Sequence, residues 1–409
     1  MRIENIQRQT RGDRVRIEAR FVYEDCYLPP VDIYYEAGPP LAEHLEALPE
    51  AFVLPGLPIA VWEGERRVQI DGTLDEKLAN GLRQASQLLN SWYDRCGNIE
   101  IEPTQGLRYS KPESQRRTVA LMSGGVDALA MLAENRRRFP LQHPNSIQTV
   151  LYAFGFSFLD RPHGNESSFM RARYEAQAKR LEKLGKQIGF DVIRLDTNIR
   201  QLHPFRGAFY YAAHSGAFLA PLIASPGYLS NALIGSVGEQ GTTQVPHGSH
   251  PLLDIQYSTA AVQVSHMQAQ VARLDKIRMI ADWEPAFNTL QVCHGWWTTS
   301  PREANCSRCE KCVRTMIGLL IAKGLHRFNT FQHNEVTPKM VDNIKIQARY
   351  DYLTMPEVIQ GLQSIGREDL IQAIQAQITR LPTRKAEKPK GRLHRNIQHL
   401  RRRFRLAAA

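Results

Sequence analysis

Several features that mark common protein classes are missing from this sequence. There is no Walker A motif and no GxGxxG motif, which excludes the P-loop and the dinucleotide-binding fingerprint. Residues Met1 to Asp13 are polar and charged, without the apolar run of a secretory signal peptide. No internal repeat is visible. Together these absences favour a cytoplasmic protein that is neither secreted nor built from repeats.

Charged side chains are missing from Gly207 to Gly238. An uncharged run of this length can indicate a membrane span. Pro221 and the turn Ser225-Pro226-Gly227 interrupt it, however. We therefore expect a buried helix followed by a central strand at Asn231 to Val237, and no membrane span.

Acidic residues are scarce at the end of the chain. Residues 384–409 hold ten Lys or Arg and one Glu, so they carry +9 of the formal net charge of +11. Leu393, Ile397, Leu400 and Phe404 recur at helical spacing, which is compatible with a basic amphipathic helix. The tail could bind nucleic acid, an anionic membrane or an acidic partner. A solvated extension is the favoured interpretation.

With 409 residues and 43% hydrophobic content, the chain can bury at least one large core and divide into several units. The composition predicts the following division: a β-rich module with one amphipathic helix at 1–112, a nucleotide-binding core at 113–290, a four-cysteine knuckle at 291–325, C-terminal helices at 326–382 and the basic tail at 383–409.

Local patterns predict the elements within these units. Alternating apolar residues at 14–23 and strand-like runs at 31–35 and 67–70 indicate a small antiparallel β module. Thr73 and Glu76 form a capping-box pattern, which predicts a helix that ends near Gly97.

From residue 117 the pattern changes to short apolar strands that alternate with longer helices. Such strands are typical of a parallel sheet buried on both faces, so we predict an α/β core with flanking helices. The expected strands are 118–122, 149–154, 191–195 and 231–237, the expected helices are 127–138 and 168–188, and residues 313–379 are expected to be mostly helical.

The sequence Ser123-Gly124-Gly125-Val126-Asp127 follows the first core strand and leads directly into a helix. Glycines let backbone N–H groups approach a phosphate, and the helix N-terminus offers positive potential to it. Ser123 can donate a hydroxyl group, and Asp127 can hold Mg²⁺ or a water molecule. This combination predicts a phosphate-binding loop.

The loop resembles the signature SGGxD of the PP-loop ATP pyrophosphatases, which cleave ATP between the α- and β-phosphates and form an adenylated intermediate. The resemblance implies a five-stranded parallel sheet with flanking helices, ATP at the carboxyl ends of the strands, and Mg²⁺. It also implies that Ser123 and Asp127 are catalytic, and that ATP is bound by Leu121, Ser123, Gly124, Gly125, Val126, Asp127, Ala153, Phe154 and Phe156. Many members carry Ser or Thr after the Asp, where this chain has Ala128.

Six cysteines are present, and Cys293, Cys306, Cys309 and Cys312 have the spacing C-x12-C-x2-C-x2-C. This spacing can bring four thiolates to one tetrahedral Zn²⁺. An iron–sulfur cluster is the alternative, although the ferredoxin pattern places its fourth Cys three residues further on, followed by Pro. Disulfides are disfavoured in a cytosolic chain. His294 could replace one thiolate, but a single His beside a metal site is more often a bystander.

Placed after a PP-loop core, the cysteine cluster resembles that of the QueC-type 7-cyano-7-deazaguanine synthases, which end in a similar knuckle followed by a helix with Arg. The likeness covers about residues 117–325. It implies that ATP activates a 7-deazaguanine carboxylate as an acyl-adenylate, which ammonia then attacks. The longer x12 spacer, the N-terminal module and the basic tail depart from these synthases.

The chain also resembles the longer QueC-like proteins of bacterial anti-phage operons, whose relatives attach a deazaguanine to a partner protein. That resemblance implies that an amine of a partner protein intercepts the acyl-adenylate.

A Gly-rich polar segment follows the fourth core strand, where ligands of open α/β sheets bind. Its polar residues are candidates for substrate contact, although such residues often only form turns. Lys311 and Arg314 could neutralise a leaving phosphate, or could be solvent-facing charges. The complete candidate set is Ser236, Glu239, His247, Ser249, His250, Asp254, Lys311 and Arg314.

Two other functions remain open. A tRNA thiolase of the same superfamily would need a cysteine to carry sulfur, and only Cys26 and Cys96 lie outside the cluster, where they are interpreted as small buried side chains. A non-enzymatic scaffold would not need the intact loop at Ser123 to Asp127.

Overall fold

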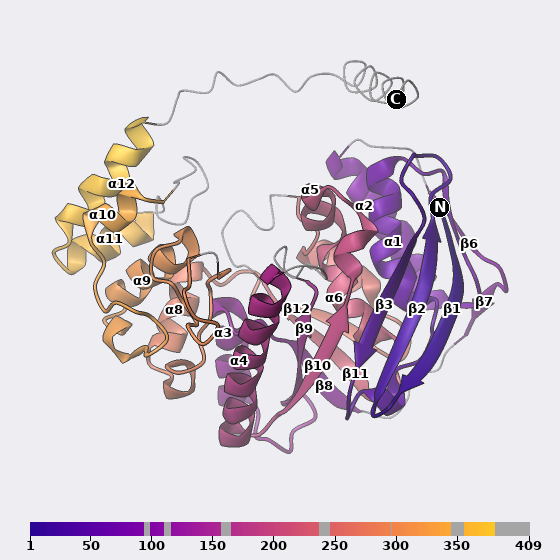
Figure 1. The fold of residues 1–409 in the computed structure, drawn as a ribbon, viewed down its shortest axis with the longest axis horizontal. Coiled ribbons are helices and arrows are strands. Elements are labelled where there is room, and N and C mark those ends of the chain that lie inside the picture. Colours follow the sequence, from indigo (N-terminus) through magenta and orange to yellow (C-terminus); the bar gives the residue numbers. More distant parts are fainter. Residues whose placement is uncertain are drawn as a thin grey trace.

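The computed structural model describes residues 1–93, 99–109, 116–156, 165–236, 246–295, 297–344 and 356–380. A ten-stranded sheet runs through the centre of the molecule (Figure 1). Its strands, in spatial order, are β12 (Gln263–Met267), β11 (Leu229–Gly235), β8 (Arg117–Leu121), β9 (Ile147–Phe154), β10 (Asp191–Thr197), β3 (Val31–Ala37), β2 (Arg14–Val22), β1 (Arg2–Arg11), β4 (Arg67–Ile70) and β6 (Glu100–Pro103). Strands β5 (Leu74–Asp75) and β7 (Leu107–Arg108) form a separate pair.

The prediction of a mostly parallel sheet with flanking helices is confirmed, but the expected number of five strands is wrong. Strands β12, β11, β8, β9 and β10 are mutually parallel. The sheet does not end there, because β10 pairs antiparallel with β3, with Leu195 opposite Ala37. An ion pair of 2.8 Å between Arg14 and Asp196 also crosses this junction. The N-terminal strands therefore extend the parallel block.

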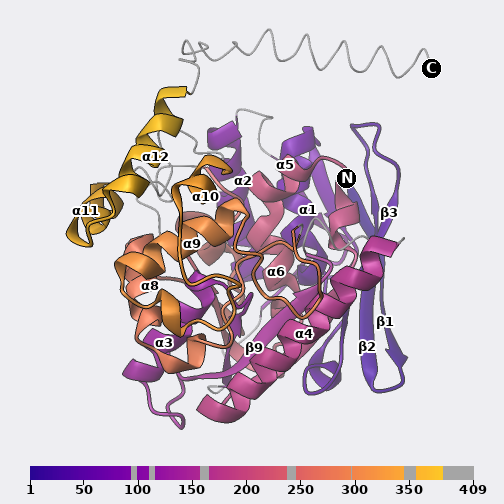
Figure 2. The same ribbon diagram turned by 60° about the vertical axis from the view of Figure 1, so that its left-hand side comes forward.

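Helices cover both faces of the sheet (Figures 1 and 2). On one face, a core that includes Val119 receives α1 (Glu50–Glu63), α2 (Glu76–Tyr93) and α6 (His214–Ile223). On the other face, a core that includes Ala120 receives α3 (Val126–Arg138), α4 (Asn165–Ile188), α8 (Arg273–Ala281) and α9 (Glu310–Ile321). Adjacent residues of β8 thus belong to opposite cores, as a strand buried on both faces requires.

Shorter elements connect and extend this framework. They are η1 (Ala42–His44), η2 (Ile199–Leu202), α5 (Arg206–Ala208), the π-helix η3 (Phe209–Ala213), α7 (Pro251–Asp254), η4 (Ile255–Tyr257), η5 (Glu284–Ala286) and η6 (Leu325–Arg327). The C-terminal helices are α10 (Pro338–Asp342), α11 (Pro356–Ser364) and α12 (Glu368–Arg380), which agrees with the helical prediction for this region.

The uncharged stretch from Gly207 forms α6 and then β11, so the buried helix and central strand are confirmed. Within the described ranges, no helix has both the length and the apolar character that crossing a membrane requires.

The predicted capping box is wrong in one respect: the side chain of Asp75, and not Thr73, accepts the hydrogen bond from Leu78 N at the start of α2. The basic tail at 383–409 lies outside the described residues.

Candidate functional site: a glycine loop and a four-cysteine centre

The predicted phosphate loop joins β8 to α3 at the carboxyl edge of the parallel strands. Ser123 is exposed, and its Oγ accepts a hydrogen bond of 3.2 Å from Gly125 N. Gly125 occupies the N-cap position of α3, with Val126 and Asp127 in the first turn. The first N–H groups of a helix have no intrahelical acceptor and can bind an anion. The geometry therefore has the form expected of an anion-binding loop.

Gly124 is required by the conformation of this loop. Its φ is +74°, in the left-handed region, and a Cβ atom there would lie 2.2 Å from Gln177 Nε2. Gln177 is buried, and its Nε2 donates to Thr289 O at 2.9 Å, so it cannot simply move aside. Gly124 O also accepts from Gln291 N at 2.8 Å. The loop is thus tied to residues 289–291, which lead to the first cysteine of the cluster.

Asp127 forms two ion pairs with helix α8. Its Oδ2 lies 2.6 Å from Arg273 Nη1, and its Oδ1 lies 3.5 Å from Lys276 Nζ. The ammonium group of Lys276 is fully buried and donates to Ser236 O. Burial lowers the pKa of Lys276, while Asp127 acts in the opposite direction. Neither cation belongs to a sequence motif, so only the fold reveals them beside the loop.

Lys311 is a third cation near the loop. Asp127 and Arg273 both lie within electrostatic range of it. Lys311 is exposed, and desolvation lowers its pKa. We call Arg273, Lys276 and Lys311 the cationic group. Arg314, the other predicted phosphate ligand, instead forms an ion pair of 2.6 Å with Glu310.

Other residues expected to bind ATP lie at the ends of two paired strands. Leu121 closes β8, whereas Ala153 and Phe154 close β9, and β8 and β9 are paired. The guanidinium of Arg171 lies 3.8 Å from the ring centroid of Phe154. Phe156 is buried and stacks on Phe218 of α6 at 3.9 Å. The structure thus brings these aromatic residues to the same edge of the sheet as the loop.

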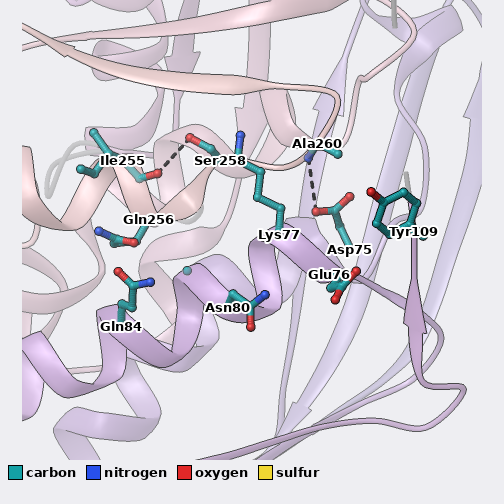
Figure 3. Close-up of a pocket in the computed structure, with 11 residues that line it drawn as sticks. Asp75, Glu76, Lys77, Asn80, Gln84, Tyr109, Ile255, Gln256, Ser258 and Ala260 are labelled. Atoms are coloured by element: carbon teal, nitrogen blue, oxygen red, sulfur yellow. Dashed lines mark hydrogen bonds between the residues drawn. The ribbon is translucent and has the colours of Figure 1, made fainter. Parts of the chain in front are cut away.

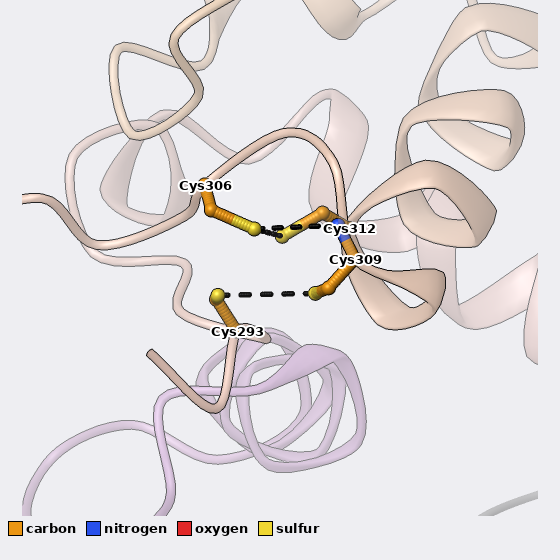
Figure 4. Close-up of side chains that lie close together, drawn as sticks. All are labelled: Cys293, Cys306, Cys309 and Cys312. Atoms are coloured by element: carbon orange, nitrogen blue, oxygen red, sulfur yellow. Dashed lines mark hydrogen bonds between the residues drawn. The ribbon is translucent and has the colours of Figure 1, made fainter. Parts of the chain in front are cut away.

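The four predicted cysteines converge on one centre (Figure 4). Their sulfur atoms all lie within 4.8 Å of one another, with 3.9 Å between Cys306 and Cys312 and 3.8 Å between Cys293 and Cys309. A tetrahedron with Zn–S bonds of about 2.3 Å has edges of about 3.8 Å, so the cluster can hold a metal ion such as zinc. The same distances are far longer than a disulfide bond, which is about 2.05 Å.

Backbone and buried side chains fix the sulfur atoms in place. Cys306 Sγ accepts from Cys309 N at 3.3 Å, and Cys293 Sγ accepts from Gly295 N at 3.3 Å. Arg173 of α4 is only 2% exposed, and it donates to the carbonyl oxygens of Cys293, Glu303 and Ala304. Helix α4 therefore holds both chain segments that carry the cysteines. His294 lies within electrostatic range of Lys311, and burial lowers its pKa to about 4.

The segment after β11 divides among several roles. Glu239 lies outside the described residues. Ser236 is buried, and its N donates to Met267 O. His250 Nδ1 caps helix α7 by accepting from Leu252 N. Ser249 Oγ donates to Asp254 at 3.0 Å.

Asp254 is fully buried and also accepts from His266 Nδ1 at 2.7 Å. His247 lies within electrostatic range of Asp254 and His266. The ring centroids of His214 and His247 lie 5.4 Å apart. No motif in the sequence marks His214 or His266 as a site residue. We call His214, His247 and His266 the imidazole group.

A separate pocket of about 530 Å³ lies at the start of α2 (Figure 3). Lys77, Asn80 and Gln84 of α2 line it opposite Gln256 and Ser258. None of the predicted site residues lines this pocket. It is therefore distinct from the loop and the cysteine centre.

Comparisons with known proteins identify no relative: no protein-family model, no curated protein and no solved structure matches the chain.

Proposed function

We propose that this chain is an ATP-dependent enzyme that adenylates a carboxylate and releases pyrophosphate. The observation that carries the proposal is the loop Ser123–Asp127, where a left-handed Gly124 and the first turn of α3 present backbone N–H groups at the carboxyl edge of a parallel sheet. The resemblance of SGGVD to the PP-loop signature implies that the anion bound by this loop is the pyrophosphate part of ATP.

The cationic group supports pyrophosphate as the leaving group. Arg273 and Lys276 contact Asp127 directly, and Lys311 lies within electrostatic range of it. Fixed positive charge beside the loop would stabilise the negative charge that develops on the departing phosphates. Mg²⁺, when bound, would neutralise phosphate charge further, and Asp127 at the loop would hold it in exchange for its ion pairs with Arg273 and Lys276.

The four cysteines would hold structural Zn²⁺. The four thiolates would fill all four positions of a tetrahedral ion and would leave no open position for catalysis. The thiolates of a [4Fe–4S] cluster bind different iron atoms and lie further apart, so the compact arrangement favours a single ion. Because Gln291 N binds Gly124 O, the metal centre would also stabilise the loop.

The substrate that we propose is a 7-deazaguanine carboxylate, as the resemblance to the QueC-type synthases implies. An amine would attack the acyl-adenylate carbon, form a C–N bond and displace AMP. The amine would come from ammonia or, as in the longer anti-phage relatives, from a partner protein.

A sulfur-transfer function receives less support. Among the described cysteines, only Cys26 lies outside the metal centre, and it is half-buried. Burial raises the pKa of its thiol to about 12, so little thiolate would exist at neutral pH.

The proposal is tested by exchange of radiolabelled pyrophosphate into ATP in the presence of 7-carboxy-7-deazaguanine. The wild-type chain should catalyse exchange that depends on the carboxylate, and Asp127→Ala should lose it by about 100-fold or more, as for loss of a preorganised charged group. Asp275→Asn on α8 is the matched control, because Asp275 is exposed and, within the described residues, pairs with Arg278 alone. Full exchange by Asp127→Ala would contradict the assignment of the loop.

A further inference from the structure

The imidazole group lies at the carboxyl edge of the parallel strands and includes no residue of the phosphate loop or the cationic group. His214 begins α6, His247 follows β11 in the chain, and His266 is in β12. Each ring has one buried nitrogen without a hydrogen-bond partner among the residues that the structure describes: His214 Nδ1, His247 Nε2 and His266 Nε2. An unsatisfied buried polar atom destabilises the folded state, so three such atoms in one place point to a ligand that pairs with them.

Asp254 determines which nitrogen of His266 carries the proton. Both carboxylate oxygens accept hydrogen bonds: Oδ1 from Ser215 Oγ and His250 N, and Oδ2 from Ser249 Oγ and His266 Nδ1. A carboxylate can only accept here, so Nδ1 of His266 must be the protonated nitrogen. Nε2 is then left with a free lone pair. The side chain of His266 is only 3% exposed, so this lone pair is buried.

The tautomer of His247 depends on Ser249. The backbone N–H of Ser249 lies 2.9 Å from His247 Nδ1, and the carbonyl oxygen of Ser249 lies 3.0 Å from the same nitrogen. In the tautomer in which Nδ1 accepts from Ser249 N, Nε2 carries the proton and can donate it. In that tautomer the group offers one buried acceptor, on His266, and one buried donor, on His247.

The imidazole group and the phosphate loop share a neighbour. Lys311 lies within electrostatic range of both Asp127 and His214. His214 in turn lies beside His247. An acyl-adenylate whose phosphate is held at the loop would therefore extend toward the imidazole group.

We propose that Asp254 and His266 form a general-base dyad for the acceptor amine, and that His247 donates a hydrogen bond to the carbonyl oxygen under attack. This inference rests on the proposed function. The amine nitrogen forms a bond to the acyl carbon, the bond from that carbon to the AMP oxygen breaks, and AMP leaves with the bonding electron pair. His266 Nε2 takes the proton that the attacking nitrogen loses, while His247 Nε2–H stabilises the transient negative charge on oxygen. In this scheme Asp254 is a positioning residue.

The experiment separates the two half-reactions. His266→Ala and His266→Gln are compared with wild-type for carboxylate-dependent pyrophosphate exchange and for amide formation from ammonium chloride, followed by mass spectrometry. Removal of a general base should slow amide formation by about 10²- to 10⁴-fold and leave exchange within about twofold. Added imidazole should restore part of the amide formation in His266→Ala. Hydroxylamine, which is largely unprotonated at neutral pH, should lose less rate than ammonium.

The matched control is His326→Ala, because His326 is exposed in η6 and outside both groups. Conclusions are drawn from whichever His266 variant keeps the wild-type circular dichroism spectrum. In that variant, unchanged amide formation, or an equal loss of amide formation and exchange, would overturn the dyad. Absence of exchange in the wild-type chain would instead overturn the proposed function, and the dyad with it.

Asp254→Asn tests the positioning role. An amide N–H directed at His266 Nδ1 would favour the tautomer with the proton on Nε2, which ¹⁵N NMR of the ring detects. Loss of amide formation together with this tautomer change supports the role of Asp254. Loss without a change of tautomer would contradict it.

Discussion

The cationic group and the imidazole group lie at one edge of the sheet and differ in charge. Arg273 and Lys276 are paired with a carboxylate and belong to the helical layer that includes the cysteine segment. Burial lowers the pKa of His214 and His247, so these rings are neutral at pH 7. Fixed positive charge suits a leaving phosphate, whereas neutral imidazole suits proton transfer. The fold thus separates the two kinds of side chain that the proposed acyl transfer would use.

The two groups also differ in what supports them. Residues 289–291 connect the phosphate loop to Cys293, and Lys311 lies between Cys309 and Cys312 in the chain. The imidazole group is supported by Asp254, Ser215 and Ser249 instead. Loss of the metal centre should therefore affect the cationic group first.

The largest effect is expected from Cys306→Ser or from removal of metal by a chelator. Structural zinc contributes about 10–16 kcal/mol of apparent binding free energy in small zinc domains, so the knuckle should lose its structure. Zinc content by atomic absorption should fall, and thermal unfolding should occur at a lower temperature. Cys26→Ser is the matched control, because Cys26 lies outside the centre. A variant that keeps its zinc and its melting temperature would show that the four cysteines do not hold the ion.

Gly124→Ala should abolish nucleotide binding. The new Cβ would overlap Gln177 Nε2, and the left-handed conformation adds strain of about 1–2 kcal/mol. Gly106→Ala is the matched control: Gly106 has a φ of +79°, but nothing lies within 4 Å of its Cβ position. Calorimetric titration with ATP should show binding for the control only. Equal ATP affinity of the two variants would mean that close packing at Gly124 is not needed for binding.

Arg273→Gln should have an intermediate effect. A hydrogen bond to a charged group contributes about 1.5–3 kcal/mol, which corresponds to a loss of about 10- to 150-fold in pyrophosphate exchange. Arg278→Gln lies on the same helix, where Arg278 pairs with exposed Asp275, and should change exchange by less than about twofold. Similar losses in both variants would indicate a general disturbance of α8.

Sequence patterns predicted the parallel strands, the glycine loop and the cysteine cluster because each depends on local residue order. Strand β1 and helix α1 escaped prediction for physical reasons. In β1 few residues are buried and a bulge interrupts the register between Glu4 and Gln7. In α1 the residues Pro55 and Pro58 argue against a helix, although nearly every residue is buried.

Contacts between distant segments could not be predicted. Arg273 forms its ion pair with Asp127, which is 146 residues away in the chain. His266 bonds to Asp254 because β12 packs next to α7. The ten-stranded sheet has the same cause, since the pairing of β10 with β3 joins residues that are far apart in the chain. Single-sequence patterns carry no signal for such pairings, so the residues that complete the site emerge only from the fold.

The smallest effect is expected from Ser249→Ala, which removes one of the four hydrogen bonds to Asp254. The remaining three keep the carboxylate in place, so stability should fall by about 0.5–1.5 kcal/mol, and this is measured by urea unfolding. Amide formation should fall by less than about tenfold, because His266 keeps its own bond to Asp254. Exchange of pyrophosphate should not change, since the hydroxyl of Ser249 bonds to Asp254 and, in the part of the chain that the structure describes, to no member of the cationic group. A loss of exchange in this variant would show that the imidazole group and the cationic group are not independent. Phosphate binding and proton transfer would then depend on shared contacts.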